Sequence, residues 1–457
     1  MSYCLAIDIG ASSGRHLLGE LVDGKLVCEE VYRFENGMIE KDGSFVWDID
    51  SLFKNVVSGL KRCKEIGKIP DTVAIDTWGV DYLLLDRSGK EILPAYAYRD
   101  SRTAGIPEEI FKTISQEELY SKTGIQKQEY NSLYQLYADK KAGRLEKAAH
   151  ILLMPSYLSY KLTGIMKNEY TEATTSNLIN AHTRTWDKDL LDFLGIDESV
   201  LGEIAAPGSA LGGLTPDVQS EVGFDCTVLL APSHDTASAV AACPINEKSV
   251  FISSGTWSLV GSENLYPVTS KEAMDANFSN EGGVEYRYRF LKNIMGMWLF
   301  QSIRKELGKK YTYDEMMQMA MESSYEKKID PTSDAFLMPE SMIGAVRDQL
   351  GEKELELGDL LSSVYHSLAS SYDLTVKEIE RVAGKTVDTV SIVGGGSKDA
   401  YLNRLTKKYT GKRVTVGPIE GTAVGNLLSQ FRYLDPSISL EDSRRIVINT
   451  FDIKEVE

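Results

Sequence analysis

Two short segments, one at the start of the chain and one in its second half, follow the same pattern. Residues 5–13 run Leu-Ala-Ile-Asp-Ile-Gly-Ala-Ser-Ser, and residues 250–258 run Val-Phe-Ile-Ser-Ser-Gly-Thr-Trp-Ser. Each is an apolar run that ends in a turn of glycine and hydroxyl residues, and further strand-like sequence follows each. A duplicated unit, a β-hairpin followed by α/β structure, would explain the pattern, although short echoes also arise by chance.

The chain has 457 residues, more than one apolar core usually supports, so we expect two domains. Apolar residues make up 42% and charged residues 26% of it, which excludes disorder as the main state. The 50 basic and 67 acidic residues give a net charge of −17. This balance argues against nucleic acid and anionic membranes as partners, but a local site can still bind an anionic substrate.

The expected location is the cytoplasm. Residues 1–10 lack the basic start of a secretory signal, and Asp8 interrupts their apolar run. No segment reaches the roughly 20 apolar residues of a membrane span. The cysteines show no metal-binding spacing, and we expect free thiols in a reducing compartment; they are Cys4, Cys28, Cys63, Cys226 and Cys243. The oligomeric state stays open between monomer and homodimer.

Local patterns predict several elements with definite bounds. Asp23-Gly24 separates two strand-like runs and predicts a tight hairpin. Asp50 is the expected N-cap of a helix through residue 63, because apolar residues then recur at helical spacing. A long helix is expected over residues 357–382. Residues 437–457 are expected to form a short acidic tail without a function.

The turn after the first strand has the composition of an anion-binding site. Asp8 to Arg15 runs Asp-Ile-Gly-Ala-Ser-Ser-Gly-Arg, so several backbone N–H groups and two hydroxyls can point at one place. Arg15 adds positive charge, and Asp8 is a candidate to hold Mg²⁺ through water. The alternative is a hairpin whose small residues only satisfy turn geometry.

Two further turns offer similar chemistry. Ser253–Ser258 repeats the hydroxyl-rich turn after a strand, and together the two turns would clamp a polyphosphate. Gly394-Gly395-Gly396 lies between an apolar strand and a helix and allows close approach of an adenosine; the alternative is a tight strand-to-helix turn. The GxxxxGK[ST] and GxGxxG motifs are absent from the sequence, so a nucleotide would be bound by another scheme.

Asp235 is the candidate general base. It follows a predicted strand within Ser233-His234-Asp235-Thr236, where a carboxylate can meet a substrate hydroxyl. The alternative is that Asp235 only caps a helix beginning near Thr236. A Ser–His–Asp triad is not expected, since neighbouring residues in a strand point to opposite faces. Polar residues that are candidates for sugar binding are Trp78, Gly79, Asp81, Tyr98, Arg99, Asp100 and Asn293.

In this order, these motifs resemble the FGGY carbohydrate kinases of the actin-like ATPase superfamily. The matching segments cover the chain from residue 4 to about residue 430; they are 8–15, 75–81, 98–102, 153–157, 233–240, 253–258, 292–296 and 392–396. The resemblance implies an α/β fold of two actin-like (ribonuclease H-like) domains with a catalytic cleft between them. Residues 1–235 would form the sugar-binding domain with the first phosphate loop, and residues 236–457 the domain with the second phosphate loop and the adenosine site.

The resemblance also implies roles for individual residues, with ATP and Mg²⁺ as cofactors and a small ketose as acceptor. The expected ATP contacts are Ala11, Ser12, Ser13, Gly14, Arg15, Thr256, Gln301 and Gly395. The expected ketose contacts are Gly79, His234, Asp235, Thr236 and Asn293, with Asp235 as the base.

Residues 11–15 and 292–296 resemble the branch that phosphorylates O1 of L-rhamnulose. L-fuculose and L-ribulose are alternative acceptors. An actin-like nucleotide switch that phosphorylates no sugar is the alternative from a different class. A catalytically inactive sugar sensor is a third hypothesis, and the intact Asp8 and Asp235 argue against it.

Overall fold

The computed structural model describes residues 2–457, which separate into two units. Unit 1 comprises the described residues up to Ala242, Asn264–Phe290 and Thr422–Thr450. Unit 2 comprises Cys243–Glu263, Leu291–Gly421 and Phe451–Glu457. These units differ from the predicted division into 1–235 and 236–457, because the helix that starts at Asp235 and two later segments pack with elements of the first unit rather than with the second half of the chain.

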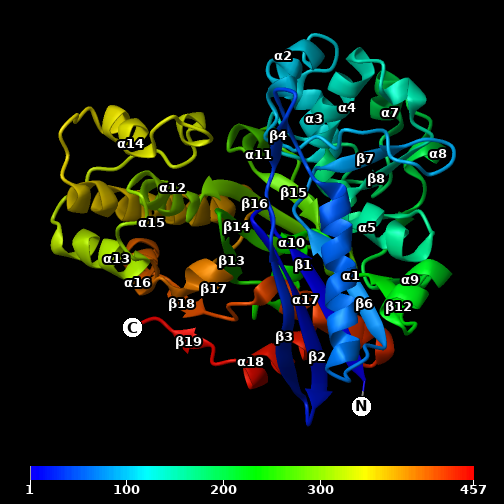
Figure 1. The fold of residues 1–457 in the computed structure, drawn as a ribbon. Coiled ribbons are helices and arrows are strands. Elements are labelled where there is room, and N and C mark those ends of the chain that lie inside the picture. Colours follow the sequence, from blue (N-terminus) through cyan, green and yellow to red (C-terminus); the bar gives the residue numbers. More distant parts are fainter. Residues whose placement is uncertain (1) are drawn as a thin grey trace. The chain divides into compact units, whose positions relative to one another are not determined.

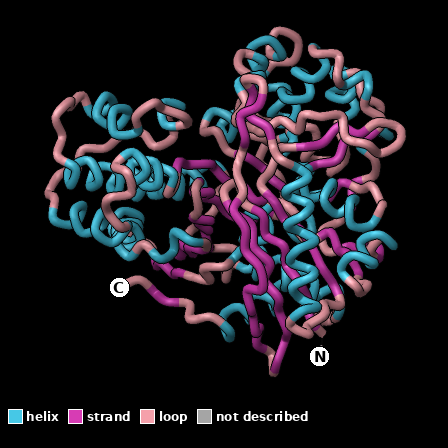
Figure 2. The backbone as a smooth tube through the Cα atoms, viewed as in Figure 1, coloured by secondary structure: helices cyan, strands magenta, loops and turns pink. Residues whose placement is uncertain are grey.

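Unit 1 is built on a six-stranded sheet with the order β11-β12-β6-β1-β2-β3 (Figure 1). The central strands β12, β6 and β1 are parallel, whereas β2 and β3 continue from β1 as an antiparallel hairpin. Asp23 and Gly24 have φ angles of 51° and 74°, so the predicted hairpin turn is confirmed. Figure 2 shows β2 and β3 as two long neighbouring strands. The bounds are β1 Tyr3–Ile9, β2 Ser13–Val22, β3 Lys25–Glu35, β6 Thr72–Thr77, β11 Ser209–Gly213 and β12 Thr227–Leu230.

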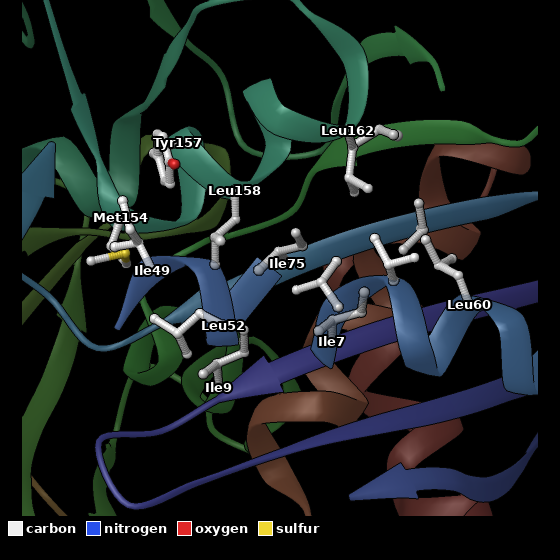
Figure 3. Close-up of a cluster of buried hydrophobic side chains, with 14 of the residues drawn as sticks. Ile7, Ile9, Ile49, Leu52, Leu60, Ile75, Met154, Tyr157, Leu158 and Leu162 are labelled. Carbon is white, nitrogen blue, oxygen red and sulfur yellow. The ribbon is translucent and has the colours of Figure 1, made fainter. Parts of the chain in front are cut away.

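Side chains of the central strands alternate between two faces of this sheet. Ile7, Ile9 and Ile75 point into an apolar cluster with Leu52 of α1 and Leu158 of α5 (Figure 3). The residues between them face the opposite side of the sheet. They include Asp8 of β1 and Asp76 of β6, which are paired positions in the ladder. One sheet face is therefore an apolar core, and the opposite face carries acidic groups at the carboxyl ends of the strands.

Helices cover both faces of the unit 1 sheet or form a second apolar cluster. Asp48, not the predicted Asp50, caps α1, since its side chain accepts a hydrogen bond from the Ser51 N–H. The bounds are α1 Ile49–Glu65, α2 Ile106–Ile110, α3 Gln116–Thr123, α4 Ser132–Lys141, α5 Met154–Thr163, α6 Tyr170–Ala173, α7 Lys188–Leu194, α8 Glu198–Leu201, α9 Pro216–Val222, α10 Asp235–Ala242, α11 Lys271–Asp275, α17 Gly421–Leu434 and α18 Leu440–Thr450. Short strands complete the unit: β4 Ile39–Lys41, β5 Ser44–Val46, β7 Tyr82–Leu85, β8 His150–Leu153, β9 Asn168–Glu169, β10 Ile204–Ala205 and β15 Ser279–Gly282.

Unit 2 repeats the arrangement of the first strands. β13 pairs antiparallel with β14 and parallel with β17, as β1 does with β2 and β6, so both segments of the sequence echo form the same local strand arrangement. The strand order is β16-β14-β13-β17-β18-β19. The bounds are β13 Ser249–Ser254, β14 Trp257–Asn264, β16 Tyr288–Met295, β17 Thr389–Val393, β18 Arg413–Val416, β19 Lys454–Glu455, α12 Trp298–Glu306, α13 Tyr313–Glu322, α14 Met342–Leu350, α15 Leu357–Val382 and α16 Ala400–Thr410. The first residues of β16, up to Phe290 and including Arg289, belong to unit 1.

The prediction that residues 437–457 form a tail is wrong. Helix α18 buries Leu440 and Val447, and the Thr450 hydroxyl accepts a hydrogen bond from the Leu26 N–H of β3. β19 then pairs with β18. The acidic residues of this segment lie on exposed faces, while its sparse apolar residues supply the packing. In residues 2–457 no helix is both long and apolar enough to cross a membrane.

Candidate active site

Three carboxylates mark the carboxyl ends of three adjacent strands in unit 1. Asp8 and Asp76 are each the second-to-last residue of their strands, β1 and β6, and Asp235 follows β12. Asp8 and Asp76 occupy paired positions of the parallel β1–β6 ladder, so their side chains leave the same face. Thr77 forms a parallel bridge to His234, which brings the residue before Asp235 to the end of β6. Carboxyl ends of parallel strands are a common place for ligand sites in α/β proteins.

The turn from Gly10 to Arg15 is closed by its own hydrogen bonds. The Gly10 N–H donates to the Ser13 carbonyl over 2.9 Å, and the Asn36 side chain donates to the Gly10 carbonyl over 2.8 Å. Gly14 is required here, because a Cβ atom would lie 2.2 Å from the Phe34 ring on β3. Ala11, Ser12 and Ser13 stay at least partly accessible. The turn is therefore a rigid hairpin with small, accessible side chains at its tip.

Arg15 lies opposite Asp8 across the β1–β2 ladder and forms an ion pair with it. Its Nε and Nη2 atoms donate to Asp8 Oδ2 over 2.9 and 2.6 Å. The pair engages one oxygen of Asp8, and the carboxylate is 10% exposed. Asp8 remains a candidate for a metal contact through water, although its charge is already partly balanced by Arg15.

Asp76 is fully buried, and only one of its two oxygens has a protein partner. Asn426 of α17 donates to Asp76 Oδ2 over 2.6 Å, whereas Oδ1 has no hydrogen bond among the described residues. Burial and the negative charge of Asp8 raise the pKa of Asp76 well above its ordinary value. An unpartnered carboxylate oxygen beside a second carboxylate fits a hydrated Mg²⁺, which keeps most of its waters. No group of three or more metal-ligating side chains is close enough for direct coordination within residues 2–457.

Asp235 is the accessible member of the three carboxylates, with 34% of its side chain exposed. It is the first residue of α10, and the Thr236 hydroxyl donates to its Oδ1 over 3.0 Å. Burial within the surrounding protein and the charge of Asp8 raise the pKa of Asp235. A raised pKa makes this carboxylate a stronger base than a free aspartate.

The turn that carries Asp235 is held in place by Glu169, a residue that sequence reasoning missed. Both the N–H and the hydroxyl of Ser233 donate to Glu169 Oε2, over 3.1 and 2.6 Å. The Thr171 hydroxyl also donates to this carboxylate and contacts the His234 N–H. Glu169 is fully buried, and burial raises its pKa despite these three donors. Beyond the end of β12, where the backbone no longer pairs with a neighbouring strand along its length, the Glu169 carboxylate thus accepts the hydrogen bond of the Ser233 N–H.

His234 and Asp235 lie side by side, contrary to the expectation from strand alternation. The strand β12 ends at Leu230, and Asp235 already begins α10, so strand alternation does not apply to this pair; His234 Nε2 lies 3.4 Å from Asp235 Oδ1. On its other side, His234 Nδ1 lies 3.1 Å from Arg289 Nη2. Arg289 forms an ion pair with Glu281, 3.1 Å away, and both are buried. Both nitrogens of His234 thus lie near a carboxylate, Nε2 near Asp235 and Nδ1 near Glu281 at 3.3 Å, but only Nδ1 also contacts a guanidinium.

Gly79 lies in a tight position beside the same sheet edge. A Cβ atom there would lie 3.2 Å from Thr175, whose hydroxyl accepts a hydrogen bond from the Val80 N–H. Nearby, Asp81 is buried and accepts hydrogen bonds from the indole nitrogens of Trp47 and Trp78. Burial raises the pKa of Asp81 to about 6. The Gln135 side chain donates to the other oxygen, Oδ1, so both oxygens of Asp81 have partners inside unit 1.

Unit 2 contains the remaining predicted ligand residues. Gly394 and Gly396 pack directly against Ser254, since Cβ atoms there would approach its backbone oxygen to 2.7 Å and its hydroxyl to 2.0 Å. Gly395 has open space around it, and Thr256 accepts hydrogen bonds from the N–H groups of Gly296 and Trp298. Gln301 is exposed on α12, and Asn293 is half-buried on β16. The glycine turn and the 253–258 turn are thus neighbours within this unit.

The structure groups the predicted residues by unit. Unit 1 holds Asp8, Ala11, Ser12, Ser13, Gly14, Arg15, Gly79, His234, Asp235 and Thr236, and unit 2 holds Thr256, Asn293, Gln301 and Gly395. The residues that the prediction missed are Asp76, Glu169, Arg289 and Asn426. Asp76 stands in a quoted motif, whereas the other three are distant in sequence from the groups they contact and carry no local signal.

Comparison with known proteins connects this site to a family. The FGGY family of carbohydrate kinases matches the chain twice, its N-terminal domain over residues 3–242 and its C-terminal domain over residues 250–434. A rhamnulokinase from Halalkalibacterium halodurans is 43% identical in an alignment that covers 99% of this chain and 98% of that protein. A rhamnulokinase from Bacillus subtilis is 39% identical, with 98% and 94% covered.

Solved structures share the fold at low sequence identity. A ligand-bound xylulose kinase from Lactobacillus acidophilus has a TM-score of 0.80 at 17% identity, covering 100% of this chain and 93% of that one. Plasmodium falciparum glycerol kinase with ADP has a TM-score of 0.79 at 15% identity, covering 100% and 94%. The predicted α/β fold with two sheet-containing domains is confirmed, as is the resemblance based on the motifs. The chain belongs to the FGGY family of carbohydrate kinases.

Proposed function

We propose that this kinase transfers the γ-phosphoryl group of ATP to O1 of L-rhamnulose and releases L-rhamnulose 1-phosphate and ADP. The choice of acceptor is supported by the names of the similar proteins, which are rhamnulokinases along nearly the full chain. The choice of base is supported by one structural observation: Asp235 is the accessible carboxylate among the three at the strand ends.

Asp235 orients the attacking hydroxyl and accepts its proton late in the transfer. A free aspartate has a pKa near 3.9, which is far too low to ionise an alcohol beforehand. Because the γ-phosphoryl transition state is loose, positioning and charge stabilisation supply most of the catalysis. The raised pKa of Asp235 helps it to hold the proton once the new O–P bond forms.

Other residues of unit 1 bind and orient the substrates in this proposal. The tip of the Gly10–Arg15 turn contacts the phosphates of ATP through backbone N–H groups and the hydroxyls of Ser12 and Ser13. Gly79, His234 and Thr236 contact the ketose. Asp8 and Asp76 hold Mg²⁺ through water, and the ion supplies neutralising charge to the phosphate oxygens.

Residues of unit 2 complete the assignment of ligand contacts. Thr256, Gln301 and Gly395 contact ATP, and the open space around Gly395 supports the approach of a flat adenosine. Asn293 contacts the ketose, and its Oδ1 is buried without a partner among the described residues.

A coupled ADP-release assay tests this function. L-Rhamnulose, L-fuculose, L-ribulose and D-xylulose are compared by kcat/KM, since specificity is a ratio of these constants. The highest kcat/KM is expected for L-rhamnulose, and a higher value for another ketose would reassign the acceptor. ADP release that no sugar stimulates would instead favour a nucleotide switch.

The matched variant is Asp235→Asn. It removes the base but keeps the shape of the side chain, so sugar binding should persist while kcat falls ~10²–10⁴-fold. The variant is compared with Asp217→Asn, an aspartate on the surface helix α9 that should keep full activity. A near-normal rate for Asp235→Asn would show that another group takes the proton.

A further inference from the structure

Arg289 is a buried cation whose contacts lead directly to the site. Its side chain is inaccessible to solvent, although it carries a permanent charge. Its Nε donates to the Gly282 carbonyl over 2.9 Å, and Nη1 lies 3.1 Å from Glu281 Oε2. Its Nη2 is 3.1 Å from Nδ1 of His234. A buried arginine is costly unless its surroundings compensate it, so this position calls for an explanation.

The contact with His234 determines where the imidazole proton lies. Every N–H of a guanidinium is a donor and none can accept, so a hydrogen bond between Nη2 and Nδ1 requires an unprotonated Nδ1. Glu281 Oε2 also lies 3.3 Å from Nδ1, which would favour a proton there. However, Oε2 has no hydrogen bond of acceptable geometry among the described residues, whereas the Arg289 contact has one. The geometry therefore favours Arg289 as the partner.

An unprotonated Nδ1 places the ring proton on Nε2, which faces the reacting groups. Nε2 lies 3.4 Å from Asp235 Oδ1, so this proton lies next to the carboxylate proposed as the base. A donor at this place can bind an oxygen of the acceptor next to the attacking hydroxyl. It cannot compete with Asp235 for the proton of that hydroxyl, because the nitrogen already carries one.

We propose that Arg289, held by Glu281 and the Gly282 carbonyl, is a positioning residue that keeps Nδ1 of His234 unprotonated and directs its Nε2–H to Asp235 and the acceptor sugar. The part that concerns the sugar rests on the proposed kinase function. The part that concerns the tautomer of His234 does not. The charges around Arg289 are consistent with this role. Burial lowers the pKa of Arg289, whereas the negative charges of Glu281 and Asp235 raise it and so stabilise the charged guanidinium.

The wild-type protein gives the first test. Protein labelled with ¹⁵N-histidine is examined by NMR, and the resonances of His234 are assigned as those lost in His234→Asn. We expect an unprotonated Nδ1 and a protonated Nε2. A proton on Nδ1 would overturn the proposal, whatever the protein phosphorylates.

The second test removes the arginine without leaving a lone buried charge. Arg289→Met combined with Glu281→Met replaces an ion pair by apolar side chains, which proteins often tolerate. We expect a mixed tautomer of His234 and a kcat for the ketose that is lower by ~10–100-fold, by analogy with the loss of groups that orient metal-binding histidines. A folded double variant with wild-type kcat would overturn the proposal. If the double variant does not fold, the wild-type spectrum alone decides.

Arg144→Gln is the matched control. Arg144 also pairs with a buried carboxylate, Asp139, and donates to backbone carbonyls of unit 1. The control should lower the thermal midpoint and leave both kcat and the His234 spectrum unchanged. Should wild-type protein phosphorylate none of the ketoses, the proposed function fails while the tautomer remains measurable.

Discussion

Acid should weaken unit 1 through His16, a side chain of β2 just beyond the Gly10–Arg15 turn. The imidazole is inaccessible to solvent, and its Nε2 lies 3.2 Å from the Val56 carbonyl of α1. The ring sits so close to α1 that a Cβ atom on Gly59 would lie 2.1 Å from it. Burial lowers the pKa of His16 to about 4, because the charged form would lose its hydration.

The sign and size of the effect follow from linkage between protonation and folding. An unfolded histidine titrates near pH 6.5, so the unfolded chain binds a proton that folded His16 refuses until about pH 4. The stability that depends on neutral His16 is complete above pH 6.5 and is lost progressively as the pH falls from 6.5 to about 4. A difference of about 2.5 pKa units corresponds to about 3 kcal/mol. This is a large share of the roughly 5–15 kcal/mol that keeps a typical domain folded.

Comparison with His16→Gln isolates this group. The amide does not titrate but can still donate to the Val56 carbonyl, so the variant lacks only the proton-linked loss. The free energy of unfolding in urea is measured for both proteins from pH 7.5 to 4.5, with tryptophan fluorescence as the signal. Wild type should lose about 2.5 kcal/mol more than the variant over this range. A constant difference, or an NMR titration of His16 in the folded protein with a midpoint near 6.5, would refute the reasoning.

Two glycines allow further predictions, each with Gly37→Ala as the control, since a Cβ atom at Gly37 meets no atom within 4 Å. Gly14→Ala forces the Phe34 ring to move and distorts the Gly10–Arg15 turn, so KM for ATP should rise at least several-fold while KM for the ketose stays nearly constant. A normal KM for ATP would remove this turn from the nucleotide site. Gly425→Ala places a Cβ atom 1.8 Å from the Ser238 carbonyl of α10, which should lower the free energy of unfolding by about 3 kcal/mol and also lower kcat, because α10 carries Asp235. Urea unfolding and the ADP-release assay measure the two effects, and unchanged stability would mean that α17 and α10 can separate without cost.

Strong local signals determined much of the fold from sequence alone. The Asp23-Gly24 turn, the helix over residues 357–382 and the repeated strand-and-turn pattern all depend on residues close together in the chain. Element bounds were less certain, as the cap at Asp48 shows, because two acidic residues there compete for the same role. The position of Asp235 at a strand end was also predictable, since it needs only the strand before it.

The environment of these groups was decided by tertiary structure. Asn426 contacts Asp76 across 350 residues of chain, and Arg289 contacts His234 across 55. Nothing in the neighbouring sequence specifies such pairs, because they arise from how strands and helices pack. The same packing removes water from His16, Asp76 and Glu169 and so shifts their pKa values. Sequence thus determined which chemical groups this kinase has, and the fold alone decided their partners and protonation, because hydration and charge pairing depend on distances in space.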